Sequence, residues 1–373
     1  MIQELKFKNY KSFKDEVILS FEATKDTTFE DYHVVEVVPG VRLLRFAMVY
    51  GANASGKSNL LDAINFLQNF LFFKADDLSE PTGTIPFKLD AATPNEPSEF
   101  SLKFYVGETK YWYELKLTPH NVISEKLYYY DSPQPKKLFD RKLKDGQSVI
   151  TFNPATVKIS AAAKEEISLK CLPNMSFFAA RNQVNIAIDK VDIAKEWLRK
   201  NLMPIINPTT GMFDYASSKM YNNAALKAYL LDFVHQADFN ISDVKSDKVS
   251  EKLPQQFVNM ILADDSAPGE IKERLKSEQV ITRIQTLFEH TVKNERGVEK
   301  YLMSTDSQSE GTKRTIGIEA AVYEAMETES FLFIDEIESS LHPELVEFIL
   351  QKFLSKKCRA QMLVTTHYDM LLN

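Results

Sequence analysis

The pattern of apolar residues divides the chain into strands and helices of an α/β protein. An almost continuous apolar run at 43–50 predicts a buried strand, as in parallel sheets that are covered on both faces. Two further apolar runs, 331–334 and 361–366, predict more strands of this sheet. Helical spacing follows the first strand, at Leu60, Ile64, Leu67 and Leu71.

Alternation with a period of two predicts an antiparallel meander beside this core. The meander consists of 100–104, 111–117, 127–129 and 149–151, and residues 1–22 predict two separate strands before the core. Cross-strand pairs explain its tyrosines and Trp112 better than a stacking platform for nucleic acid does. The polar stretch 23–40 predicts a loop, and the basic run 136–144 predicts a solvated hairpin tip.

The middle of the chain has mostly helical spacing. Helices are predicted at Ala161–Leu169, Val191–Leu202, Asn222–Ala237 and Pro254–Leu262. Prolines and glycines separate them, and no heptad pattern lasts long enough for a coiled coil. We therefore expect a compact helical insertion lobe at 156–280, between an N-terminal half at 1–155 and a C-terminal half at 281–373.

Composition narrows the functional classes. Hydrophobic residues make up 44% and charged residues 26% of the chain, which is ordinary for a globular protein. The net charge of −7 argues against a surface that attracts nucleic acid everywhere. Two distant cysteines, Cys171 and Cys358, favour a reducing compartment, and the apolar runs are too short to span a membrane. We expect a cytoplasmic protein.

The segment Gly51–Ser58 fits the phosphate-loop pattern G-x-x-x-x-G-K-[ST], between a predicted strand and a predicted helix. Its glycines let several N–H groups point at one anion, and the helix start adds a positive dipole end. Lys57 is expected on the phosphates of ATP and Ser58 on Mg²⁺. The predicted nucleotide-binding residues are Asn53, Ala54, Ser55, Gly56, Lys57, Ser58 and Asn59.

Acidic residues and a histidine follow the two later strands. Asp335 directly follows the run 331–334 and is expected to complete the coordination shell of Mg²⁺. Glu336 is placed to orient or deprotonate the attacking water. His367 directly follows the run 361–366 and is expected to sense or polarise the terminal phosphate. The predicted catalytic residues are Glu336, His367 and Lys57.

A serine and a glycine, Ser309 and Gly311, stand at the start of another predicted helix. A serine at this position commonly caps a helix, and the same geometry can present N–H groups and a hydroxyl to an anion.

Together these parts resemble the ABC-type ATPase heads of the SMC, RecF and OLD families. The segments 7–13 (FKNYKSF), 310–314 (EGTKR), 335–338 (DEIE) and 341–343 (LHP) carry the resemblance. The sequences of the last three segments are most similar to those of AAA-labelled ATP-binding proteins of bacterial anti-phage and abortive-infection operons.

The resemblance implies an ABC-type P-loop ATPase core with an antiparallel meander and a helical insertion lobe. It further implies that two heads sandwich two ATP molecules, with Ser309 and Gly311 of one subunit facing the nucleotide of the other. The expected assembly is a homodimer or a larger even-numbered oligomer. The family's usual leucine and first glycine are replaced by Gln308 and Glu310.

Several functions fit these features. The first is an ATPase that acts as sensor or scaffold and controls a separately encoded effector in anti-phage defence. The second is a RecF- or SMC-like ATPase of DNA repair or chromosomes, which binds duplex DNA. A switch that clamps ATP with negligible hydrolysis is disfavoured by the intact Asp335–Glu336 pair, and a transporter subunit by the large insertion.

Overall fold

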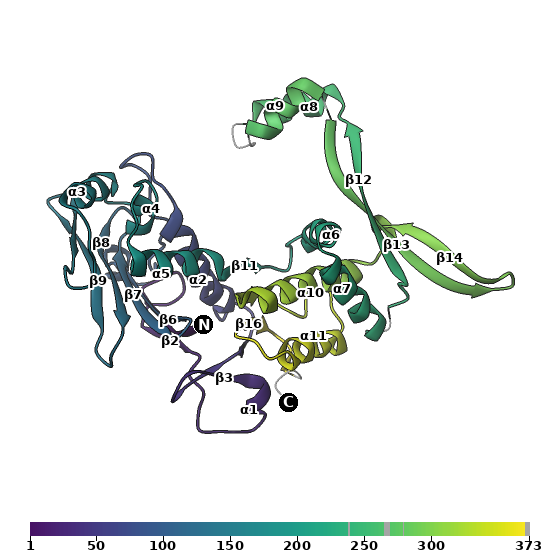
Figure 1. The fold of residues 1–373 in the computed structure, drawn as a ribbon, viewed down its shortest axis with the longest axis horizontal. Helices are drawn as coiled ribbons and strands as arrows, with labels where there is room; N and C mark the ends of the chain where they lie inside the picture. Colours follow the sequence, from purple (N-terminus) through teal and green to yellow (C-terminus); the bar gives the residue numbers. More distant parts are fainter. Residues whose placement is uncertain (238, 265–268, 279, 370–373) are drawn as a thin grey trace. The chain divides into compact units, whose positions relative to one another are not determined.

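The structure is a computed structural model and describes residues 1–237, 239–264, 269–278 and 280–369 (Figure 1). The chain divides into two compact units. The first unit consists of Met1–Pro208, Glu324–Ser339 and Ile349–Asn373, and the second of Thr209–Tyr323 and Ser340–Phe348. Among the described residues, no helix combines the length and the apolar character that a membrane crossing needs.

A parallel sheet of four strands lies in the first unit. Its order is β11 (Leu202–Ile206), β15 (Phe331–Ile334), β16 (Gln361–Thr366) and β5 (Phe46–Tyr50). All residues of β15 and β16 are buried, as their apolar runs predict. β5 lies at the edge of this sheet and is only partly buried, so the prediction of cover on both faces is wrong for this strand.

Helix α2 (Lys57–Phe72) follows β5 through the glycine-rich loop. Its apolar positions are buried in the main core of the unit, as the spacing predicts. That core also contains residues of α4 (Phe177–Arg181) and α5 (Asp189–Lys200). The loop between β5 and α2 is thus fixed at both ends by packed elements.

An antiparallel sheet of seven strands also contributes to this core, and the predicted meander is confirmed. Its order is β10–β9–β8–β7–β6–β1–β2. The bounds are β1 (Ile2–Lys8), β2 (Val17–Ser20), β6 (Ser98–Val106), β7 (Thr109–Leu117), β8 (Val122–Tyr130), β9 (Lys136–Lys144) and β10 (Gln147–Phe152). Alternate residues of β6 and β7 are buried, and they form the inner face of the sheet.

The basic run 136–144 is strand β9, and the prediction of a solvated hairpin tip is wrong. Arg141 is fully buried and forms an ion pair of 2.9 Å with the fully buried Glu125 on β8. Glu125 also accepts hydrogen bonds from Tyr113 Oη, Ser176 Oγ and the Phe177 amide. Burial, followed by the Glu125 charge, raises the pKa of Tyr113, so the phenol stays a donor.

Several short elements of the first unit were missed by the sequence analysis. The predicted loop 23–40 contains α1 (Glu30–His33) and β3 (Val34–Val38), and β3 pairs with β4 (Val41–Leu44) across a turn at Gly40. A 3₁₀ turn lies at Thr93–Asn95. Helix α3 (Ala161–Lys170) confirms the predicted helix in that region and is capped by Ser160.

The second unit contains a three-stranded antiparallel sheet in the order β12 (Asp243–Lys252), β13 (Val280–Asn294) and β14 (Gly297–Ser304). In Figure 1, β12 and β13 form a long ribbon that ends in α8 (Gln255–Ala263) and α9 (Gly269–Glu278). The remaining elements are α6 (Met212–Asn222), α7 (Ala224–Gln236) and a 3₁₀ turn at Thr305–Ser307. Two helices, α10 (Glu310–Thr328) and α11 (Pro343–Ser355), begin in the second unit and end in the first.

The expected helical lobe at 156–280 therefore differs from the structure. Helices α3 to α5 and strand β11 belong to the first unit, and β12 belongs to the three-stranded sheet. Strand β11 was not predicted, because Pro204 suggests a break in the chain's regular structure. An edge strand tolerates proline, because one side of the strand needs no N–H donors. The sequence of β12 (DVKSDKVSEK) is mostly polar and carries little apolar alternation.

Breaking the buried ion pair should strongly destabilise the first unit. We expect Arg141→Met to cost about 3 to 5 kcal/mol of unfolding free energy, because the Glu125 charge stays buried without its counter-ion. Urea denaturation measures the change in unfolding free energy. The matched control is Lys142→Ala, which replaces the exposed residue next to Arg141. Adding Glu125→Gln to Arg141→Met should recover part of the loss; a further loss of the full single-variant size would contradict the charge argument.

Candidate functional site

The glycine-rich loop Gly51–Ser58 connects β5 with α2, as predicted. Gly56 has φ +97°, and a side chain there would also come within 3.0 Å of Ser12 Oγ and 3.2 Å of the Phe13 ring. At Gly51 a Cβ atom would lie 2.8 Å from Ser55 Oγ. Gly56 is therefore needed for the loop's conformation, whereas a side chain at position 51 would require the Ser55 hydroxyl to move. The N-terminal segment around Ser12 supports the loop from one side.

Most predicted nucleotide-binding residues of the loop present exposed side chains. Asn53, Ala54, Ser55 and Ser58 are exposed, and Gly56 is partly buried. The amide of Asn59 donates a 2.9 Å hydrogen bond to Ser12 Oγ. The N–H groups of the first turn of α2 have no partner within the helix, so this end can bind an anion such as a phosphate.

Lys57 is the first residue of α2 and is 7% exposed. Its ammonium donates to the carbonyl oxygens of Gly51 at 2.7 Å and Ala52 at 3.0 Å. The third neighbour of Nζ is His367 Nδ1, at 3.1 Å. Three acceptors thus hold the lysine charge at the centre of the loop.

Asp335 and Glu336 lie at the carboxyl end of β15, as the sequence predicts. Thr365, which is fully buried on β16, links them through its hydroxyl. The hydroxyl donates to Asp335 Oδ1 at 2.5 Å and accepts from the Glu336 amide at 2.9 Å. With Oδ1 held by Thr365, the second carboxylate oxygen of Asp335 is the one that would bind a metal ion.

His367 follows β16 and joins the catalytic candidates. Its Nε2 lies 3.1 Å from Glu336 Oε1, and its Nδ1 lies 3.1 Å from Lys57 Nζ. An imidazole with its proton on Nε2 satisfies both contacts, since Nε2–H donates to the carboxylate and Nδ1 accepts from the ammonium. The structure thus connects Lys57, His367 and Glu336 in one hydrogen-bonded chain.

These residues fit Mg²⁺ bound together with a phosphate. Hydroxyl and carboxylate oxygens, here those of Ser58 and Asp335, are ligands that Mg²⁺ prefers. In the described part of the chain, no group of three or more histidine, cysteine, aspartate or glutamate residues could hold a metal ion alone. A metal that takes most of its ligands from phosphate and water agrees with this donor set.

Ser309 and Gly311 lie in the second unit, at the start of α10. Ser309 Oγ accepts a 3.0 Å hydrogen bond from the Thr312 amide, which is a helix cap. A Cβ atom at position 311 would lie 2.8 Å from the Ser340 carbonyl oxygen, so this close approach requires glycine. Glu310 is mostly exposed and pairs with Lys313 at 2.5 Å, while Gln308 Nε2 lies 3.2 Å from His290 Nε2.

Two residues near the catalytic candidates were missed by the sequence analysis. Thr365 is one of three polar residues in the mostly apolar strand β16, together with Gln361 and Thr366, and its position near the strand's carboxyl end was the available signal. Glu338 accepts a 2.6 Å hydrogen bond from the His367 amide. It follows the Asp335–Glu336 pair in the sequence, but spacing alone gives no sign of this contact.

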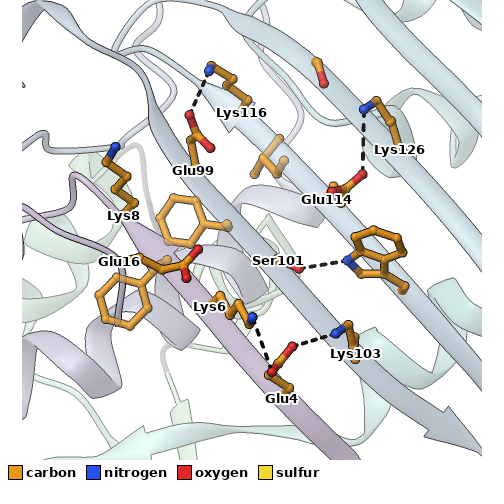
Figure 2. Close-up of a pocket in the computed structure, with 15 residues that line it drawn as sticks. Glu4, Lys6, Lys8, Glu16, Glu99, Ser101, Lys103, Glu114, Lys116 and Lys126 are labelled. Carbon is orange, nitrogen blue, oxygen red and sulfur yellow. Dashed lines mark hydrogen bonds and ion pairs between the residues drawn. The ribbon is translucent and has the colours of Figure 1, made fainter. Parts of the chain in front are cut away.

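The outer face of the antiparallel sheet is a separate feature (Figure 2). Trp112 stacks on Tyr128 across β7 and β8 with ring centroids 4.9 Å apart, which confirms the predicted cross-strand pairing. Lysines on this face pair with glutamates, as in Lys103–Glu4 at 2.8 Å and Lys116–Glu99 at 2.7 Å. Because these charges are neutralised locally, the face offers little attraction to a phosphate backbone.

The fold and the loop define a P-loop nucleotide-binding protein of the AAA/ABC type. The chain belongs to the family described as "AAA domain, putative AbiEii toxin, Type IV TA system", whose model matches residues 46–158 and 211–373. No curated protein matches the chain. The sequence-based resemblance is thus confirmed at the level of this ATPase class.

Two solved structures are similar. One is the SmcHead bound to the C-winged helix domain of ScpA, with 14% identity, a TM-score of 0.41, and coverage of 100% of this chain and 91% of that chain. The other is the Smc head domain with an extended coiled coil, bound to the C-terminal domain of ScpA derived from Pyrococcus furiosus. It has 12% identity, a TM-score of 0.38, and coverage of 100% and 90%.

Removing the Thr365 hydroxyl should weaken the binding of Mg²⁺ together with the nucleotide. We expect Thr365→Val, which has nearly the same shape, to raise the Mg²⁺ concentration needed for half-maximal nucleotide binding by about tenfold, the cost of one lost charge-assisted hydrogen bond. A titration with a fluorescent ATP analogue measures this. Thr365→Ser keeps the hydroxyl and should behave as the wild type. An unchanged Mg²⁺ midpoint in Thr365→Val would contradict this role of the hydroxyl.

Proposed function

We propose that the protein binds and hydrolyses Mg-ATP, closes as a dimer around the nucleotide, and controls a separate effector in a defence module. The observation that carries the ATPase proposal is the hydrogen-bonded chain from Lys57 through His367 to Glu336. Asp335 is tied to the same assembly by Thr365. A cation and two carboxylates lie at the end of one parallel sheet, and in this proposal Glu336 is the base and Asp335 the metal ligand.

Each residue has a defined task in this proposal. The N–H groups at the start of α2 and the Lys57 ammonium bind the phosphates. Glu336 holds the attacking water and takes its proton, and His367 Nε2–H keeps the Glu336 carboxylate oriented. Mg²⁺, when bound, supplies positive charge that stabilises the transferring phosphoryl group. Lys57 must exchange its bonds to the loop carbonyls for bonds to phosphate oxygens.

The dimer and the effector rest on other support. Ser309 and Gly311 stand at a helix start that could contact the nucleotide of a second subunit, as the resemblance to ABC-type heads implies. The family description names a putative AbiEii toxin of a Type IV TA system, and it supports a place in a defence module. Hydrolysis would then open the dimer and pass a conformational change to the effector.

The alternative is an SMC-like ATPase that binds duplex DNA. The net charge of −7 and the paired lysines of the antiparallel sheet weigh against it. DNA affinity that falls steeply between low and physiological salt would favour it over the defence role.

Replacing the loop lysine tests the phosphate-binding assignment. We expect Lys57→Ala to abolish ATP binding and turnover, because the phosphates lose a fixed charge. Isothermal titration with ATP and a phosphate-release assay measure the two effects. The matched control is Lys74→Ala, which replaces an exposed lysine just beyond the end of α2. Normal turnover by a folded Lys57→Ala protein would contradict the assignment.

Replacing the base separates binding from hydrolysis. We expect Glu336→Gln to bind ATP but to turn it over at least about a hundredfold more slowly, the usual contribution of a general base. Light scattering of this variant should show a doubled mass, or a larger even-numbered assembly, after Mg-ATP is added. A constant monomer mass would contradict closure of two subunits around ATP, and a fast variant would remove the role of Glu336.

A further inference from the structure

The chain makes a tight turn directly after the Asp335–Glu336 pair. Glu336 has φ +48°, a left-handed conformation that is costly for a residue other than glycine. The Ser339 amide donates to the Glu336 carbonyl at 2.9 Å and closes the turn, and the Ile337 amide donates to the Thr365 carbonyl at 3.1 Å. The turn therefore stays attached to β16 and brings the Glu338 side chain beside the end of that strand.

The Glu338 carboxylate continues the hydrogen bonding where the strand ladder has ended. The backbone pairing of β15 with β16 has its last register pair at Ile334 and Val364. Three residues later, the His367 amide donates to Glu338 Oε1 at 2.6 Å, so a side chain takes the place of a strand carbonyl. A carboxylate acceptor makes this bond stronger than a backbone one.

This bond fixes the backbone of the residue whose side chain connects the site. The His367 ring lies between Lys57 Nζ and Glu336 Oε1, with 3.1 Å to each. A displacement of the His367 backbone would lengthen both contacts together. Misplacement by about 1 Å can lower turnover by about a hundredfold.

The second oxygen of Glu338 gives independent support. Glu338 Oε2 is buried, and it has no hydrogen-bond partner in the described part of the chain. A buried carboxylate oxygen without a donor costs stability, and such a group needs an explanation other than folding. A role of Glu338 in the position of His367 supplies one.

We propose that Glu338 is a positioning residue for ATP hydrolysis, which holds the His367 backbone so that its ring meets Lys57 and Glu336 at once. The inference rests on the proposed function, since it assigns a role within the same site. Glu338 touches neither nucleotide nor metal in this proposal, and it acts through His367.

Two substitutions separate position from general stability. Glu338→Ala removes the acceptor, and Glu338→Gln keeps an acceptor oxygen at the same reach. We expect Glu338→Ala to lower kcat at least about tenfold, the effect of a lost charge-assisted bond, with ATP affinity within about threefold of the wild type. Glu338→Gln should restore kcat to within about threefold. Glu165→Gln, on the exposed surface of α3, is the matched control.

Three outcomes would overturn the proposal. They are an unchanged kcat in Glu338→Ala, a Glu338→Gln variant as slow as Glu338→Ala, and a parallel loss of ATP affinity and melting temperature in both. The last result would mean that Glu338 serves the fold in general.

A measurement without nucleotide distinguishes this inference from the proposed function. The chain has six histidines, so ¹⁵N-histidine labelling gives few amide signals, and His367→Gln assigns one of them. A strong hydrogen bond to a carboxylate shifts an amide proton downfield. We expect the His367 signal to move upfield in Glu338→Ala and to move by a smaller amount in Glu338→Gln, whose neutral amide oxygen still accepts the bond. If the wild type hydrolyses no ATP, the proposed function fails, while an unmoved signal in Glu338→Ala would refute the contact itself.

Discussion

The first unit depends on the hydrogen bonding of β16. All six residues of this strand are buried, and it pairs in parallel with β15 on one side and β5 on the other. At its start, the Gln361 side chain accepts from the Ile2 amide at 2.6 Å and donates to the Ile2 carbonyl at 2.9 Å. Gln361 thus acts as one more strand residue and joins the parallel sheet to β1 of the antiparallel sheet. The other end of β16 carries Thr365 and His367, so the same strand links the core to the site.

The charged groups of the site are connected to one another through short contacts. The Lys57 ammonium lies near two carbonyl oxygens and an imidazole, and the carboxylates of Glu336 and Glu338 contact the ring and the amide of His367. A bound phosphate would compete for Lys57, and the His367 ring would lose a partner on that side. The occupancy of the phosphate site and the orientation of Glu336 are therefore coupled through one histidine.

Much of the fold and of the site could be predicted from the sequence, because these parts carry local patterns. The alternation in β6 and β7 follows from one buried face, and the loop Gly51–Ser58 follows from backbone chemistry at fixed spacing. Strand β11 could not be predicted, because Pro204 stands at the centre of this short strand and suggests a break. Arg141 was predicted to be exposed to solvent, because a charged side chain in a basic run usually is. Only the fold shows that Glu125 lies opposite it. The contacts of Thr365 and Glu338 likewise exist only once β15 and β16 lie side by side.

The Arg141–Glu125 pair has a consequence for the order in which the chain folds. Its donors and acceptors come from β7, β8, β9, β10 and the segment 172–177, including Tyr113, Ser148 and Ser176. Neither charge can leave water cheaply before all of these partners have arrived. A hairpin of β8 and β9 alone would keep both groups hydrated. Strands β7 to β10 and the residues leading into α4 should therefore assemble in one cooperative step, late in folding, after the chain has closed the loop from residue 141 to residue 175.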